Sequence, residues 1–345
     1  MAPRRFPIFS FPRTAAERIL QNVPVAELFE ISLLSKRAFD LVKQSTPLTE
    51  LEFDVILSAS PTVYAYCGND KTEWIFYEKR DSRRQELEDM ETRTVRVSEG
   101  KSGSLMFSKL SQTCYGRCLD SIEDVLQFAQ WICCLFNCNA HRLSLRAAQY
   151  QHLKAVHSVA VLRKSKQFFI MEGTVSHDEM VQIIEGFEPD LLQICCDPGP
   201  NFNYDRPISV QDFRVYGGSW VKGPMLLNLH SETVTVMNVD VTEEDAIAFL
   251  NRVLENQDGC GNMCSAVFYR VTRARESEFV YDNRPMKTWD LEKITNALSS
   301  YEQEIIPTNP VNSGRVWRKN RTNFIDVGNE ESDALTLKKD QVVII

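Results

Sequence analysis

Cysteine and histidine are the residue types in this sequence whose spacing first indicates chemistry. Five cysteines and one histidine fall within residues 114–141, and another cysteine pair follows. These residues are Cys114, Cys118, Cys133, Cys134, Cys138 and His141, then Cys260 and Cys264. Closely spaced Cys and His are the ligands of structural zinc sites. Cys133 and Cys134, however, lie in the apolar run WICCLF, and a buried free cysteine behaves as a small apolar residue. We therefore expect no metal and no cofactor.

Familiar catalytic motifs do not occur in the sequence. It has no phosphate-binding loop, no Gly-rich dinucleotide turn, no GxSxG and no HExxH. Its five histidines lie in no catalytic spacing, and no cysteine is marked as activated by a neighbouring histidine or helix end. We expect that the chain is not an enzyme. A cysteine or zinc enzyme is the alternative, and metal analysis with thiol-reactivity profiling would separate the two.

Composition narrows the class of protein further. The chain has 345 residues, of which 43% are hydrophobic and 25% charged, with a net charge of −8. Such a composition is ordinary for a globular protein, and an acidic balance argues against nucleic acid as the main partner. No apolar run has the length of a membrane helix, and the N-terminus lacks a secretory signal. We expect no membrane partner, free thiols, and a cytoplasmic or nuclear location.

The elements that must position any functional residue begin with residues 6–45. Pro12 predicts a helix start, and apolar residues then recur at helical spacing up to Val23. Pro24 ends this helix or starts the next, and residues 28–34 and 38–42 continue the pattern. The sequence thus predicts three short helices. They are either the first layer of the following domain or a surface that completes its apolar face with a partner.

The order of residues in this module resembles an F-box. The matches are Phe11-Pro12, Ile19-Leu20, Val23-Pro24, Glu27-Leu28 and the stretch Leu33-Leu34-Ser35-Lys36-Arg37, with Phe39 near the position of the usual Trp. The resemblance implies docking on a Skp-type adaptor, which bridges to a cullin. The residues carried over to adaptor binding are Phe11, Pro12, Ile19, Leu20, Val23, Pro24, Leu28 and Leu33. Some would face the adaptor and others would hold the helices together.

The remainder of the chain predicts a mixed α/β fold. Residues 51–57 and 62–78 have the composition of strands, the latter with a turn at 68–71, whereas 98–104 predicts a flexible connection. Three segments, at 119–147, 174–197 and 240–271, each predict a capped helix followed by a strand. Their predicted caps are Ser121 with Asp124, Ser176 with Glu179, and Thr242 with Asp245. This recurrence predicts a layer that is like a leucine-rich repeat, or a non-repeating α/β domain.

A second resemblance lies at about residues 200–280, which are similar to the nematode-type F-box-associated domain. Val241-Thr242, Asp245 and Phe249-Leu250 carry it. The two resemblances together imply an F-box at 6–45, an α/β substrate-recognition region at 47–310 and a C-terminal tail at 311–345. They imply a substrate-recognition adaptor of a Skp–cullin–F-box ubiquitin ligase that holds an unknown protein target. The alternative is a non-catalytic scaffold whose N-terminal helices pack on its own body.

Overall fold

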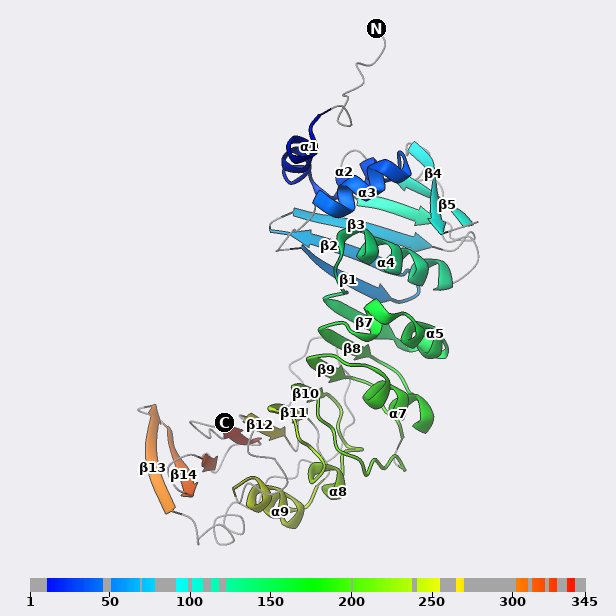
Figure 1. The fold of residues 1–345 in the computed structure, drawn as a ribbon. Coiled ribbons are helices and arrows are strands. Elements are labelled where there is room, and N and C mark those ends of the chain that lie inside the picture. The colour runs from blue at the N-terminus through cyan, green and yellow to red at the C-terminus, as the bar shows by residue number, and fades with distance from the viewer. Residues whose placement is uncertain are drawn as a thin grey trace. The chain divides into compact units, whose positions relative to one another are not determined.

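The computed structural model describes residues 11–45, 51–68, 70–77, 91–98, 101–107, 113–117, 122–199, 201–237, 241–254, 265–269, 302–309, 312–319, 323–327 and 334–338. Within these ranges the fold is mixed α/β and begins with N-terminal helices, as the sequence predicts. The chain divides into two compact units, Met1–Lys166 and Gln167–Ile345. Figure 1 shows both units as a ribbon.

The first unit is built on a mixed sheet with the strand order β7-β1-β2-β3-β6-β5-β4. The strands are β1 (Leu51–Leu57), β2 (Thr62–Cys67), β3 (Asp70–Tyr77), β4 (Glu91–Ser98), β5 (Lys101–Phe107), β6 (Thr113–Arg117) and β7 (Arg142–Arg146). Neighbours are antiparallel except β1 with β7 and β3 with β6, which are parallel. The predicted strand at 51–57 and the predicted strand pair around the turn at Gly68 are both confirmed.

Helices cover one face of this sheet. They are α1 (Arg13–Leu20), α2 (Val25–Ser32), α3 (Lys36–Ser45) and α4 (Ile122–Phe136), followed by the 3₁₀ helix η3 (Ala147–His152), α5 (Leu153–Ser158) and α6 (Ala160–Arg163). Alternate residues of β1, namely Phe53, Val55 and Leu57, are fully buried. Figure 1 shows α2, α3 and α4 on the same side of β1–β3. The buried residues, which alternate along the strands, therefore face the apolar sides of these helices.

The second unit contains parallel strands whose order follows the chain. Its strands are β8 (Gln167–Met171), β9 (Leu191–Ile194), β10 (Asp212–Val215), β11 (Thr233–Met237) and β12 (Ser265–Tyr269), and from β8 to β12 each pairs in parallel with the next. Helix α7 (His177–Gly186) connects β8 to β9, α8 (Gly223–Leu226) precedes β11, and α9 (Glu243–Leu254) connects β11 to β12. The predicted helix–strand recurrence is thus present in this unit.

Antiparallel strands continue the sheet of the second unit beyond β12. They are β13 (Glu302–Asn309), β14 (Asn312–Lys319), β15 (Asn323–Val327) and β16 (Ala334–Lys338), in the order β13-β14-β15-β16-β12. The basic stretch 315–324 lies largely in β14 and β15.

Two of the three predicted helix caps are formed. Ser176 accepts a bond from the Glu179 N–H at 3.3 Å, and Glu179 Oε2 accepts one from the Ser176 N–H at 2.7 Å. Thr242 and Asp245 make the same reciprocal pair, at 3.2 and 3.1 Å. Each pair satisfies amide groups that have no partner within the helix. Ser121 lies outside the described residues. The predicted flexible connection at 98–104 is wrong from Lys101 onward, where β5 begins between β4 and β6.

Candidate partner-binding site on the N-terminal helices

Prolines and one serine define the helices of the N-terminal module, which we take as α1–α3. Pro12 and Pro24 occupy the residue before α1 and α2, so that neither interrupts a helix interior. Ser35 accepts a bond from the Ala38 N–H at 3.1 Å through its hydroxyl. Ser35 therefore caps α3.

The buried faces of the three helices meet each other. Both α1 and α2 pack against α3. The buried side chains are Ala16 and Leu20 of α1, Val25, Leu28 and Phe29 of α2, and Ala38 and Val42 of α3. Leu20 and Leu28, both predicted to bind the adaptor, are each only 1% exposed. Their side chains hold the module together and are not available to a partner in this arrangement.

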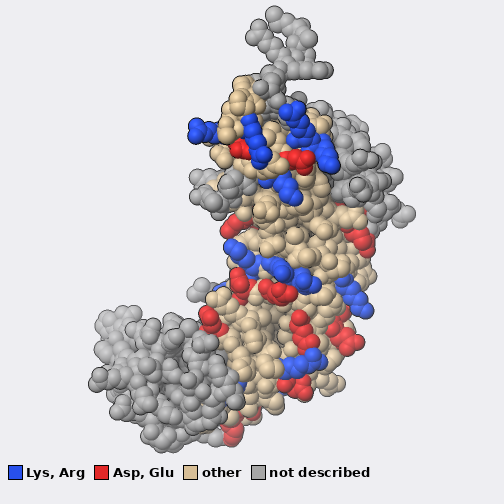
Figure 2. Space-filling view, viewed as in Figure 1, with Lys and Arg blue, Asp and Glu red and all other residues tan. Residues whose placement is uncertain are grey.

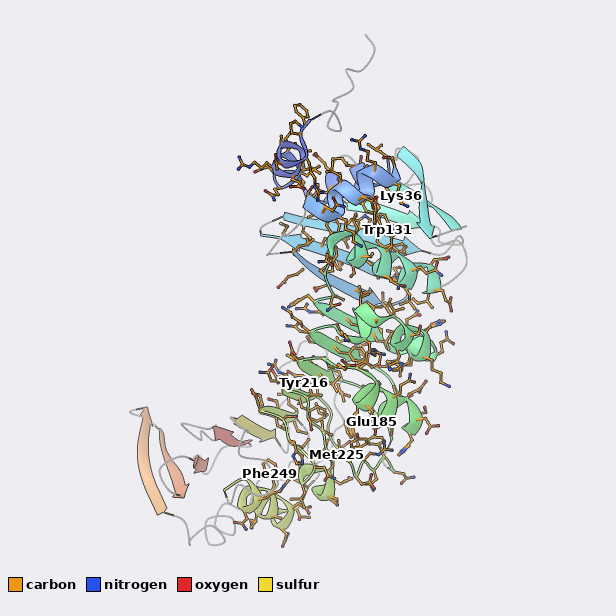
Figure 3. All side chains as sticks on the ribbon, viewed as in Figure 1. Lys36, Trp131, Glu185, Tyr216, Met225 and Phe249 are labelled. Carbon is orange, nitrogen blue, oxygen red and sulfur yellow. The ribbon has the colours of Figure 1, made fainter. Side chains whose placement is uncertain are left out.

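An aromatic cluster ties the module to the rest of the first unit. The ring of Phe29 lies 5.4 Å from both Trp74 of β3 and Trp131 of α4, and 5.9 Å from Phe128 of α4. Phe39 of α3 adds a contact to Trp131 at 5.7 Å. Figure 3 places Trp131 beside the module. Aromatic side chains of this size contribute strongly to a core, so α2 and α3 share the core of the unit.

The remaining predicted site residues lie at or near the surface. Phe11 is 41% exposed, Pro12 and Pro24 are exposed, and Ile19, Val23 and Leu33 are half-buried. Leu34 was not among the predicted site residues, yet it is 73% exposed. It is the second residue after α2, within the Leu33-Leu34-Ser35 stretch that carries the resemblance. The outward face of the module thus offers Phe11, Leu34 and the exposed edges of the half-buried residues.

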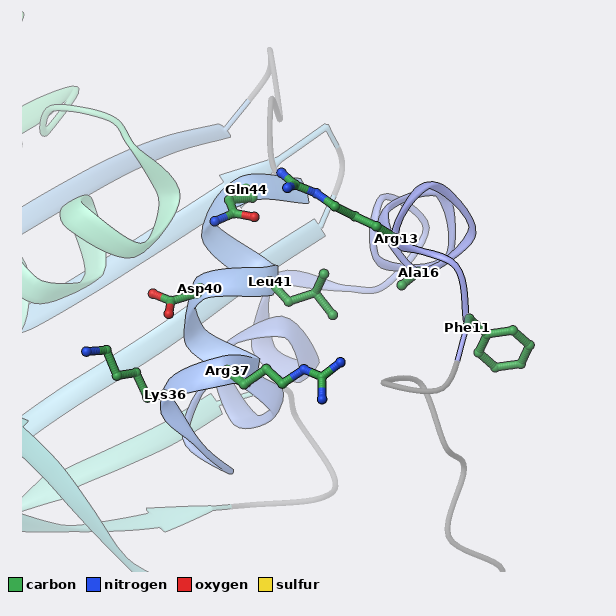
Figure 4. A pocket seen from close by; sticks show the side chains of 8 residues that line it. All are labelled: Phe11, Arg13, Ala16, Lys36, Arg37, Asp40, Leu41 and Gln44. Carbon is green, nitrogen blue, oxygen red and sulfur yellow. The ribbon is translucent and has the colours of Figure 1, made fainter.

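A cavity of about 570 Å³ lies between α1 and α3. It is lined by Phe11, Arg13, Ala16, Lys36, Arg37, Asp40, Leu41 and Gln44. Figure 4 shows Arg37 and Leu41 projecting from α3 toward α1, and Arg13 extending from α1 toward Gln44. Arg13 also pairs with Glu17 at 2.7 Å on its own helix. The cavity therefore combines an apolar wall with basic groups, which suits an apolar side chain flanked by acidic ones.

Helices α1 and α3 differ in the sign of their charge from the whole chain. Helices α1 and α3 carry five basic and two acidic residues, although the chain has a net charge of −8. Figure 2 shows Lys and Arg side chains gathered over this part of the first unit. Because like charges repel and opposite charges steer association, this surface favours an acidic partner.

A second cluster of ionisable residues lies where β1 meets β7. Asp54 is 5% exposed, and His141 Nδ1 lies 3.6 Å from both Asp54 Oδ1 and Glu52 Oε2. Arg142 Nη1 lies 3.7 Å from Asp54 Oδ2. Burial raises the pKa of Asp54 above its ordinary 3.8, although Arg142 and His141 act to lower it. Sequence reasoning missed this cluster because 87 residues separate Asp54 from His141, and no local pattern joins them.

Comparison with known proteins gives no family assignment: no family model, no curated protein and no solved structure matches the chain.

Two further findings concern metals and membranes. In the ranges that the structure describes, no group of three His, Cys, Asp or Glu residues is arranged to hold a metal ion. Of the residues considered for zinc, Cys118, Cys260 and Cys264 lie outside those ranges. None of the described helices has both the length and the apolar character needed to cross a membrane.

Proposed function

We propose that this chain is the substrate-recognition adaptor of a Skp–cullin–F-box ubiquitin ligase. Residues 6–45 would be the F-box and would dock on a Skp-type adaptor, which connects to a cullin and a ubiquitin-charged conjugating enzyme. The chain would be non-catalytic. It would raise the effective concentration of a target lysine near the charged enzyme, which converts an encounter between free proteins into one within a complex.

The observation that supports this proposal is the division of apolar residues within α1–α3. Leu20, Leu28 and Phe29 are buried in the module and its aromatic cluster, whereas Phe11 and Leu34 remain exposed. A module that served only as a first layer of the core would have no need of large apolar side chains on its outer face. Phe11 lines the basic cavity, and aromatic side chains are enriched in surfaces that bind another protein.

The second unit would hold the target. The parallel order of β8 through β12 is what stacked helix–strand units produce, since each unit packs on its predecessor. We propose that this layer is like a leucine-rich repeat and that residues 200–280 form an F-box-associated domain. Trp220 of this unit is 1% exposed and packs against Phe202 at 5.4 Å, so it belongs to the core.

Surface variants test the proposal better than core variants, because Leu20→Asp or Leu28→Asp would unfold the module. The experiment is a pull-down of the purified full chain with a purified Skp-type adaptor. The test variant is Phe11→Asp with Leu34→Asp, which changes only exposed side chains of the module. The matched control is Leu227→Asp, which alters an apolar residue of the second unit that is 38% exposed.

We expect the adaptor to retain the wild-type chain and the Leu227→Asp chain in similar amounts. The retained amount of the double variant should be at least about tenfold lower, because apolar residues at the centre of an interface contribute most to binding. Circular dichroism would verify that all three chains are folded. Equal retention of the double variant and the control, or no retention of the wild type, would contradict the proposal.

A non-catalytic scaffold is the second candidate, and the contacts of Phe29 with Trp74 and Trp131 favour it. These contacts mean that deletion of residues 1–45 would expose the aromatic cluster under either candidate. Deletion therefore does not separate the two functions. Adaptor binding does, because a scaffold whose helices serve only its own body would not bind a Skp-type adaptor.

A further inference from the structure

Helix α4 ends in a turn that brings two cysteines together. Asn137 follows the helix with a φ of 52°, a left-handed conformation that Asn adopts more readily than most residues. The Cys138 N–H then donates to the Cys133 carbonyl at 3.0 Å. This bond spans the positions of a Schellman motif, in which the two side chains also come into contact. The sequence CCLFNC thus places two thiols side by side.

The two thiols differ in exposure. Cys133 is 1% exposed, whereas Cys138 is partly open to solvent, and neither is in a disulfide. A side-chain hydrogen bond joins them. Because the Cys133 thiol stabilises the Cys138 thiolate, the pKa of Cys138 is lowered, and the same bond, together with burial, raises the pKa of Cys133. The more accessible sulfur is therefore the better nucleophile of the pair.

Two other cysteines provide internal comparisons. Cys195 is also partly buried, but burial raises its pKa and its described partner is the amide of Gln193. Cys134 is exposed and lies 3.3 Å from Lys43 Nζ. Neither has the arrangement of an accessible sulfur hydrogen-bonded to a buried thiol. That arrangement is the one in which a first oxidised sulfur has a second thiol ready to react with it.

We propose that Cys133 and Cys138 form a peroxide-reactive dithiol site, in which Cys138 is oxidised first and Cys133 then closes a disulfide. This inference is independent of the proposed ligase function. It assigns a modification site to the end of α4 and names a hydroperoxide as the oxidant.

The chemistry takes two balanced steps. The Cys138 thiolate attacks one oxygen of hydrogen peroxide, so that an S–O bond forms, the O–O bond breaks and hydroxide leaves. Sulfur loses two electrons, which the peroxide gains. The Cys133 sulfur then attacks the sulfenic sulfur of Cys138, the S–S bond forms and the S–O bond breaks. The departing hydroxide takes the Cys133 proton and leaves as water.

The test uses the reduced, full-length chain and peptide mass spectrometry. Iodoacetamide should alkylate Cys138 about tenfold faster than Cys195 near neutral pH, because their thiolate fractions are shifted in opposite directions. Hydrogen peroxide should give a disulfide between Cys133 and Cys138. In Cys133→Ala the disulfide should be lost and dimedone should capture a sulfenic acid on Cys138. Cys134→Ser should form the disulfide as the wild type does.

The alkylation comparison needs no variant, so it remains decisive if Cys133→Ala fails to fold. Alkylation of Cys138 no faster than that of Cys195 would overturn the proposal. So would oxidation that joins Cys134 to Cys138 as often as it joins Cys133 to Cys138.

Discussion

Phe29 of α2 and Trp131 of α4 meet edge to face, with ring centroids 5.4 Å apart and planes at 88°. One ring belongs to the N-terminal module and the other to the α/β body, so this contact is one of those that join both parts of the first unit. Edge-to-face pairs add to the stabilisation that burial alone provides. The module is therefore a structural part of this unit, whatever it binds on its outer face.

Replacement of Phe29 by Ala should destabilise the first unit by about 3–5 kcal/mol, since a fully buried ring leaves a cavity among three other aromatic side chains. Urea unfolding followed by tryptophan fluorescence would measure the change, because Trp74 and Trp131 flank the ring. Phe11→Ala is the matched control, and its effect should stay within about 0.5 kcal/mol because Phe11 is 41% exposed and lies outside the aromatic cluster. Similar losses for both variants would show that Phe29 is not a core residue.

Local patterns in the sequence predicted several of the elements but not their packing partners. The reciprocal caps at Ser176 and Thr242 could be predicted because all their groups lie within three residues. Strand β1 could be predicted from its β-branched and aromatic residues. The contact of Phe29 with Trp131 could not, because it depends on how segments far apart in the sequence pack. For the same reason the sequence suggested adaptor binding for Leu28, which the structure buries.

The buried carboxylate of Asp54 should make stability depend on pH in a defined direction. Its pKa is raised above 3.8 by burial, which exceeds the lowering effects of Arg142 and His141. A carboxyl group with a raised pKa in the folded state stabilises the fold most when it is protonated. Its contribution is fully present below pH 3.8 and declines as the pH rises through the folded-state pKa.

Asp54→Asn, which cannot ionise, should therefore gain stability relative to the wild type as the pH rises from about 3 to about 5.5. Urea unfolding at a series of pH values would measure the difference. Glu52→Gln serves as the control, because the Glu52 side chain is 52% exposed and faces the same histidine. A fall in the stability of Asp54→Asn relative to wild type as the pH rises would contradict the assigned direction.

Close packing of α8 on α9 should make Gly223 sensitive to substitution. A Cβ at this position would collide with the Asp245 carboxylate. That carboxylate cannot move away freely, because Asp245 Oδ2 accepts bonds from the Thr242 N–H and hydroxyl at 3.1 and 3.0 Å. Gly223→Ala should therefore cost about 1–3 kcal/mol, the range for overpacked positions.

A double-mutant cycle would isolate the collision at Gly223. In an Asp245→Ala background the carboxylate is absent, and Gly223→Ala should cost much less than it does in the wild type. The free energy of unfolding of the full chain and its three variants supplies the four corners of the cycle. Equal costs in both backgrounds would show that the carboxylate is not the group that resists the added methyl.

Basic residues of the α1–α3 cavity should control how fast an acidic partner associates. Lys36→Glu places an acid beside Asp40 on the same cavity wall, which reverses part of the local field. For a Skp-type adaptor that docks here, we expect the association rate to fall by about tenfold at low salt, with little change in the dissociation rate.

Lys154→Glu, an exposed charge reversal on α5, is the matched control with the same change in net charge. Stopped-flow association at increasing salt would measure both, and the variants should converge as screening removes the field. A loss that persists unchanged at high salt would instead indicate a direct contact by Lys36, and equal losses for both variants would indicate that only net charge matters.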